Sequence, residues 1–190
     1  MSDRFQNKYR IESTRLKNWD YGWNATYFVT ICTQNRECYF GDVVGGDMVL
    51  NEIGKIANDC WMVISEHFPF VKLGEHVVMP NHVHGIVVID KPDDGRSVSV
   101  GTRLIAPLPT EQTKTPGGIT GNKNPMLHDN LSKIIRWYKG RTTFESRKIH
   151  ADFAWQPRFH DHIIRNDESF HRISEYIKNN PANWSSDQFR

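Results

Sequence analysis

Residues 71–90 read V-K-L-G-E-H-V-V-M-P-N-H-V-H-G-I-V-V-I-D, and this stretch decides the fold. Valine and isoleucine dominate both halves, and the turn-forming segment 79–81 divides them, so the pattern predicts two strands. A joint this short implies that the strands pair antiparallel. Because side chains alternate along a strand, His82 and His84 share one face, while Val83 points to the other face and into the core.

The rest of the chain supplies further elements around this strand pair. Apolar and β-branched residues predict a strand at 25–33, and apolar residues at helical spacing predict a helix at 51–67. The same reasoning places a helix at 130–148, a strand-like piece at 153–165 and a last helix from the cap Asn166 to the stop at Pro181. The order β-α-β-β-loop-α-β-α predicts an α+β protein, a ferredoxin-like antiparallel sheet with helices packed on one face.

Length and composition indicate one globular domain. The 190 residues carry 24 basic and 22 acidic side chains, a net charge of +2, which permits binding to nucleic acid without arguing for it. Residues 1–24 read as an N-terminal arm and the proline-punctuated 91–127 as a long flexible loop within the same domain, 1–190. There is no membrane-length apolar run, and the three cysteines lack a C-x-x-C motif, so we expect a cytoplasmic protein.

Two histidines on one strand face are a weak signal by themselves. They are either ordinary half-exposed strand residues or the ligands of one metal ion, and the apolar residues on both sides favour a ligand role for His82 and His84. A second pair, His160 and His162, encloses Asp161, which is costly to bury. That second segment is therefore either an edge strand with two wet faces or a hydrogen-bonding element.

The last helix carries two further candidates. Tyr176 and Asn180 are four residues apart and lie on one helix face, at the rim of an apolar stripe. From the helix alone, a packing tyrosine and a helix-capping asparagine remain open alternatives.

The ordered segments M-P-N-H-V-H-G-I-V-V, W-Q-P-R-F-H-D-H-I-I-R and E-Y-I-K-N-N-P resemble the HUH superfamily of nucleases. More narrowly, the chain from about residue 9 to 184 resembles the single-tyrosine transposases of small insertion sequences, and above all the REP-associated tyrosine transposases. The resemblance implies that His82, His84 and Asn180 hold a divalent ion, Mg²⁺ or Mn²⁺. It also implies that Tyr176 is the catalytic nucleophile and that it forms a 5′-phosphotyrosine link. A rival nucleophile is Tyr138, which lies within the basic helix and which we expect to pack or to contact DNA. The asparagine at 180 matches the REP-associated branch, whereas the insertion-sequence branch usually has glutamine there.

The expected partner is single-stranded or hairpin DNA, and we expect no membrane partner. The protein is expected to act as a monomer or a homodimer. Residues 131–148 hold six basic side chains against one acidic side chain, with an aromatic pair inside them, which suits phosphate contacts and base stacking. Two alternatives stay open: a hairpin-binding module without catalysis, and a hydrolase that uses a metal-bound water. The side chains expected to contact DNA are Lys133, Arg136, Lys139 and Arg141.

Overall fold

The computed structural model describes residues 19–92 and 128–187. The first part of the expected arm and nearly all of the expected loop 91–127 therefore lie outside the described residues. The strands are β1 (Ala25–Cys32), β2 (Gly41–Val44), β3 (Asp47–Leu50), β4 (Val71–Met79), β5 (His82–Ile89) and β6 (His160–Ile164). The helices are α1 (Glu52–Met62), α2 (Ile64–His67), α3 (Leu131–Ser146) and α4 (Asp167–Asn179), with 3₁₀ turns η2 (Gln34–Arg36) and η4 (Pro181–Ser186).

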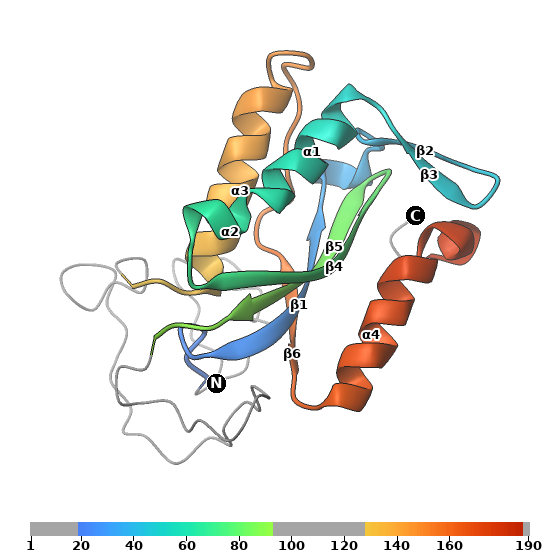
Figure 1. Cartoon of the computed structure of the whole chain (residues 1–190). Coiled ribbons are helices and arrows are strands. Elements are labelled where there is room, and N and C mark those ends of the chain that lie inside the picture. The colour runs from blue at the N-terminus through green and yellow to red at the C-terminus, as the bar shows by residue number, and fades with distance from the viewer. Residues whose placement is uncertain (1–18, 93–127, 188–190) are drawn as a thin grey trace, which may run out of the picture.

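The central sheet has the strand order β4-β5-β1-β6, and each neighbouring pair is antiparallel. The chain reaches β4 from β1 through α1 and α2, and β6 from β5 through α3 (Figure 1). This is the βαββαβ order of a ferredoxin-like sheet, so the predicted α+β class and antiparallel sheet are confirmed. A two-stranded sheet, β2 with β3, stands apart from it.

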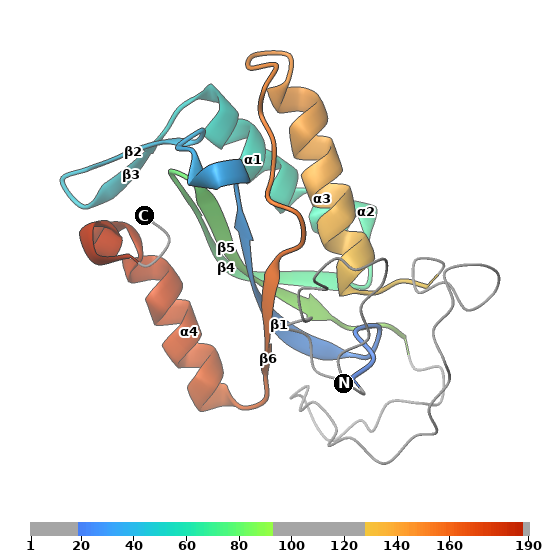
Figure 2. The same ribbon diagram turned by 180° about the vertical axis from the view of Figure 1, so that it is seen from behind.

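Helices cover both faces of the sheet, which corrects the expectation of one face. The main core, built from Val83, Val87 and the buried side chains of β1, packs under α1 and α3. A second apolar cluster joins Ile86 and Ile164 to Ile177 of α4. Figures 1 and 2 show α4 on the side of the sheet opposite α1 and α3. The physical reason is that alternate positions of β5 are apolar on both faces, so both faces need cover.

The hairpin β2–β3 is an element that the sequence analysis missed. Its strands pair from Gly41 with Leu50 to Val44 with Asp47, and Gly45 and Gly46 form the turn. Both glycines have positive φ, 63° and 90°, which suits a tight two-residue hairpin turn. The Gly-Gly dipeptide between valine-containing runs is the signal that predicts it.

Several predicted boundaries also shift. The helix predicted at 51–67 divides at Val63, and the strand predicted at 153–165 begins only at His160. The last helix runs from the cap Asn166 to Asn179 and ends before Pro181 as predicted, and Pro181 then opens the 3₁₀ turn η4, where a proline's missing N–H costs nothing. Trp19 and Tyr21 of the expected arm are buried in the main core.

Among the described residues, no helix combines the length and apolar character needed to cross a bilayer.

Candidate active site

Strand β5 holds the two histidines on the sheet face that α4 covers. His82 and His84 are 0% and 1% exposed, and their ring centroids lie 4.5 Å apart. Val83 between them is buried against the main core, as the alternation of strand side chains predicts. The two imidazoles are thus buried side by side on one face, not half-exposed strand residues.

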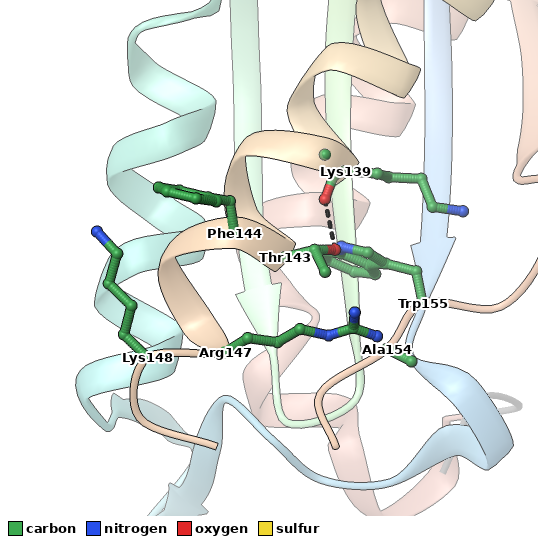
Figure 3. Close-up of a pocket in the computed structure, with 8 residues that line it drawn as sticks. Lys139, Thr143, Phe144, Arg147, Lys148, Ala154 and Trp155 are labelled. Atoms are coloured by element: carbon green, nitrogen blue, oxygen red, sulfur yellow. Dashed lines mark hydrogen bonds between the residues drawn. The ribbon is translucent and has the colours of Figure 1, made fainter. Parts of the chain in front are cut away.

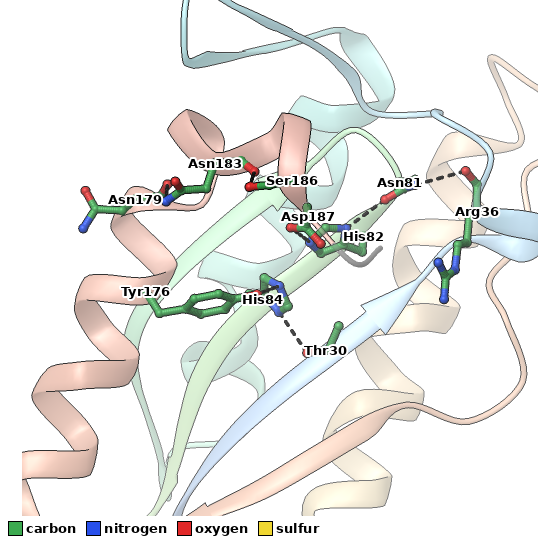
Figure 4. A network of polar contacts seen from close by, with 10 residues as sticks. All are labelled: Thr30, Arg36, Asn81, His82, His84, Tyr176, Asn179, Asn183, Ser186 and Asp187. Carbon is green, nitrogen blue, oxygen red and sulfur yellow. Dashed lines mark hydrogen bonds and ion pairs between the residues drawn. The ribbon is translucent and has the colours of Figure 1, made fainter. Parts of the chain in front are cut away.

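Neighbouring polar groups fix the orientation of both rings (Figure 4). The amide of Asn81 donates from Nδ2 to the Arg36 carbonyl at 3.2 Å, so its Oδ1 faces Nδ1 of His82 at 2.8 Å. An amide oxygen only accepts, so Nδ1 of His82 carries the proton and Nε2 carries the lone pair. The hydroxyl of Thr30 lies 2.8 Å from Nδ1 of His84. Partners of this kind on the far nitrogen orient a histidine for metal binding.

Burial keeps both imidazoles uncharged near neutral pH. Loss of water lowers the pKa of His82 to about 4, although Asp187 and Asn180 both act to raise that pKa. Burial and then the neighbouring His82 lower the pKa of His84 well below its ordinary value. A neutral imidazole binds a cation without first releasing a proton.

Helix α4 brings the predicted tyrosine to this pair. Ile177 is buried in the second apolar cluster, and this contact turns the adjacent Tyr176 toward the histidines while 42% of the tyrosine stays exposed. The Tyr176 hydroxyl lies 3.3 Å from Nε2 of His84 (Figure 4). Phe28 stacks on His84, with ring centroids 5.2 Å apart, and meets Tyr176 edge-on at 6.1 Å. Burial, and then the charge of Asp187, raise the pKa of Tyr176.

Asn180 lies one turn beyond Tyr176 and is only 2% exposed. Its side-chain amide raises the pKa of His82 and lowers the pKa of Tyr176, so it is near enough to influence both residues. Its Oδ1 is buried and has no hydrogen-bond partner within residues 19–92 and 128–187. A buried, unsatisfied amide oxygen beside two neutral imidazoles is a donor set that fits a divalent cation.

A carboxylate that the sequence analysis missed joins this group. Asp187 follows η4, and its side chain is 3% exposed, with Oδ2 lying 3.9 Å from Nε2 of His82. One ligand atom each from His82, His84 and Asp187 all lie within 4.8 Å of one another. No spacing motif links residue 187 to residue 82, so only the fold could reveal this contact.

The other sequence candidates lie elsewhere. His160 and His162 are exposed on β6, which is an edge strand, whereas Asp161 between them is partly buried, so only one face of this strand is open to solvent. His160 pairs with Thr30, and Thr30 pairs with His84, so His160 lies two strands away from the site histidines. Tyr138 is fully buried and donates its hydroxyl to the Ala57 carbonyl at 3.1 Å, which makes it a core residue.

The basic helix α3 covers the opposite face of the sheet, away from Tyr176 (Figures 1 and 2). Arg136 is exposed, Lys133 pairs with Asp129 at 2.7 Å, and Arg141 pairs with Glu145 at 3.4 Å. Lys139 instead donates to the carbonyls of Gln156 and Arg158, and its burial lowers its pKa to about 8.

Two open grooves flank this helix. One groove of about 490 Å³ contains Arg136 and the Trp137 ring, which stacks on His67 with centroids 4.4 Å apart. The other, of about 760 Å³, contains Phe144, Arg147 and Lys148 (Figure 3). Cations beside aromatic rings at both grooves are typical of surfaces that bind nucleic acid.

Comparison with known proteins finds sequence relatives of this chain and a solved structure with the same fold. No family model matches the sequence. A Haemophilus influenzae (strain ATCC 51907 / DSM 11121 / KW20 / Rd) protein named "Uncharacterized protein" is 37% identical over 177 residues, which cover 93% of this chain and 91% of that protein. A protein of the same strain named "Putative REP-associated tyrosine transposase" is 26% identical over 165 residues, covering 86% of this chain and 73% of that protein.

A solved structure shares the fold. It is the structure of a REP-associated tyrosine transposase bound to a REP hairpin, with a TM-score of 0.56 and 19% identity over 92% of this chain and 74% of that one. The chain is thus similar in sequence to a protein named as a putative REP-associated tyrosine transposase, and it shares the fold of a solved member of that family. Both comparisons agree with the resemblance that the sequence segments carry.

Proposed function

We propose that this protein is a metal-dependent endonuclease and strand transferase that cuts single-stranded DNA at hairpin-forming sites through a 5′-phosphotyrosine intermediate. One observation carries the proposal: the Tyr176 hydroxyl reaches His84 on a buried two-histidine face, and the buried Asn180 lies one helical turn beyond Tyr176. A phenol beside a cation-binding donor set is the arrangement that covalent phosphoryl transfer needs.

The chemical step conserves the phosphodiester bond energy. The oxygen of Tyr176 forms a bond to the DNA phosphorus as the bond from phosphorus to the 3′ oxygen breaks. The phenol loses its proton, and the departing 3′ oxygen gains one, so the products are a 5′-phosphotyrosine and a 3′ hydroxyl. Attack of a 3′ hydroxyl on the phosphotyrosine reverses the step and joins strands without ATP.

His82, His84 and Asn180 would hold the cation. A bound Mg²⁺ or Mn²⁺ would polarise the scissile phosphate and offset the charge that develops on it. The raised pKa of Tyr176 means that the phenol alone is a poor nucleophile at neutral pH, so its activation depends on this neighbourhood.

The DNA contacts of the proposal are divided between two faces. Around the site, Arg36 is an exposed cation close enough to lower the pKa of His82, and it suits a phosphate near the cut. On the opposite face, Lys133, Arg136 and Arg141 border the groove beside Trp137. The REP hairpin bound by the similar solved protein supports a hairpin as the ligand of that second surface.

The decisive experiment looks for the covalent adduct. Single-stranded DNA with a hairpin and a 3′-end label is incubated with the protein and Mn²⁺, and the products are separated on a denaturing protein gel. We expect label to migrate with the protein, because the 5′ phosphate of the labelled fragment stays on the tyrosine. Tyr176→Phe should abolish that band, whereas Tyr138→Phe should retain it because Tyr138 is a core residue.

Each failure points to a different alternative. An unchanged adduct in the Tyr176→Phe variant removes Tyr176 as the nucleophile. Cleavage without any adduct indicates a hydrolase that uses a metal-bound water. Hairpin binding without cleavage in either Mg²⁺ or Mn²⁺ indicates a recognition module.

A further inference from the structure

We propose that Asp187 is a fourth protein ligand of the cation, and that cation binding anchors the segment 181–187 onto the sheet. This inference rests on the proposed function, because it adds to the donor set of the same site. It assigns a role to a carboxylate outside the histidine pair and helix α4.

The path of the chain explains how a residue so near the end reaches the site. Helix α4 ends at Asn179, Asn180 continues directly into η4, and Pro181 supplies a preset φ at the first position of that turn. The six residues of η4 reverse the chain, and Asp187 then follows in extended backbone. Figure 4 shows that Asp187 thereby lies beside His82, on the same side as Tyr176.

The distances suit ligands of one ion. Ligand atoms at about 2.1 Å from a common cation lie roughly 3–4 Å from each other. The 3.9 Å between Asp187 Oδ2 and His82 Nε2 falls in that range, and the His84 ligand atom lies within 4.8 Å of both. The Asp187 side chain is 3% exposed, so the carboxylate faces the site and not solvent.

The mixed donor set indicates which ion the site prefers. Two imidazole nitrogens favour transition metals, whereas amide and carboxylate oxygens also suit Mg²⁺ and Mn²⁺. A site with two nitrogen and two oxygen donors, one of them anionic, therefore selects Mn²⁺ over Mg²⁺.

Cation binding should also order the end of the chain. Trp184 of η4 packs near His82, with ring centroids 6.1 Å apart, so the turn already borders the site. A bond from Asp187 to the cation would hold both ends of η4, because Asn180 binds at its start. Backbone amides of 181–187 should then exchange hydrogen more slowly when the ion is bound.

The test measures Mn²⁺ binding by titration calorimetry on the full chain, in wild type and in the Asp187→Asn, His82→Ala and Asp42→Asn variants. Asp187→Asn preserves size and removes the charge, and Asp42 is an exposed aspartate of β2 that serves as the matched control. We expect Asp187→Asn to weaken Mn²⁺ binding by about 10-fold or more, while the preference over Mg²⁺, which the two imidazoles set, should remain. Asp42→Asn should bind as wild type does.

Hydrogen exchange of the 181–187 peptide supplies a second measurement. Mn²⁺ should slow this exchange in wild type and have little effect in the Asp187→Asn variant. If His82→Ala abolishes binding while Asp187→Asn binds Mn²⁺ as wild type does, the Asp187 assignment is wrong and the metal site stands. If wild type binds no Mn²⁺ at all, the proposed function fails together with this inference.

Discussion

The hydroxyl of Tyr176 lies 3.3 Å from Nε2 of His84, and in the tautomer that binds a cation through Nε2 this nitrogen offers a single lone pair. The nitrogen therefore either accepts a hydrogen bond from the phenol or binds a cation, but it does not do both. When no ion is bound, this hydrogen bond holds the side chain of Tyr176 beside His84. Cation binding at this nitrogen would break the contact and free the hydroxyl to meet a phosphate.

Thr30 should matter for the cation through His84. Thr30→Val preserves shape and removes the hydroxyl that lies 2.8 Å from Nδ1 of the histidine. We expect Mn²⁺ affinity to fall about 10-fold, because outer partners of metal-binding histidines typically contribute this much. Calorimetry with the folded variant checks the result. Unchanged affinity would mean that packing against Phe28 alone orients the ring.

The protein should lose stability on acidification through its buried histidine. The pKa of His82 is about 4 in the folded chain and about 6.5 when unfolded, so the unfolded chain binds more protons between these values. Stability from this group is thus full above pH 6.5 and falls as the pH drops toward 4, by on the order of 3 kcal/mol.

Urea unfolding in EDTA at several pH values measures this effect. His82→Leu should reduce the slope, because leucine does not titrate, and the part that remains belongs to groups such as the buried His84, whose pKa is also lowered. The exposed His171 provides the control, and His171→Asn should leave the slope as in wild type. An equally steep slope in His82→Leu would assign the effect to other groups.

Two basic residues of α3 should behave differently on substitution. Arg136 is exposed beside the Trp137 groove, so Arg136→Gln should weaken hairpin binding and reduce the salt-dependence slope by about 1. Lys139 donates to two backbone carbonyls, so Lys139→Gln should cost about 1–2 kcal/mol of stability and change the slope little. Fluorescence anisotropy over a salt series, together with urea unfolding, separates these outcomes. A larger slope change for Lys139→Gln would reverse the assignment.

Two glycines should respond oppositely to alanine. A Cβ at Gly85 would lie 2.1 Å from the Trp61 ring, so Gly85→Ala should cost about 3 kcal/mol or more. A Cβ at Gly140, within α3, meets nothing within 4 Å, so Gly140→Ala should stabilise the helix by about 0.5–1 kcal/mol. Urea unfolding measures both values. A neutral Gly85→Ala would show that Trp61 can move aside.

Much of the fold was predictable because its signals are local. The strand pair around residues 79–81 and the shared face of His82 and His84 follow from alternation along a strand. The sheet face on which α4 packs does not follow from alternation, because it depends on which face of the folded sheet the other helices leave uncovered. The hairpin at Gly45 and Gly46 was predictable and was missed.

The site was predictable only in part. Tyr176 and Asn180 lie on one helix, so their four-residue spacing was enough to predict that both side chains share a helix face. Two contacts depend instead on segments that meet only in the folded chain. One is the contact between Asp187 and His82. The other is the pair of hydrogen bonds that Lys139 donates to the carbonyls of residues 156 and 158.

Strand β5 assigns alternate residues to separate tasks. Val83 and Val87 secure the main core, whereas His82 and His84 face Tyr176 and contribute nothing to that core. A lineage could thus discard its chemistry by exchanging two side chains and still inherit an intact scaffold.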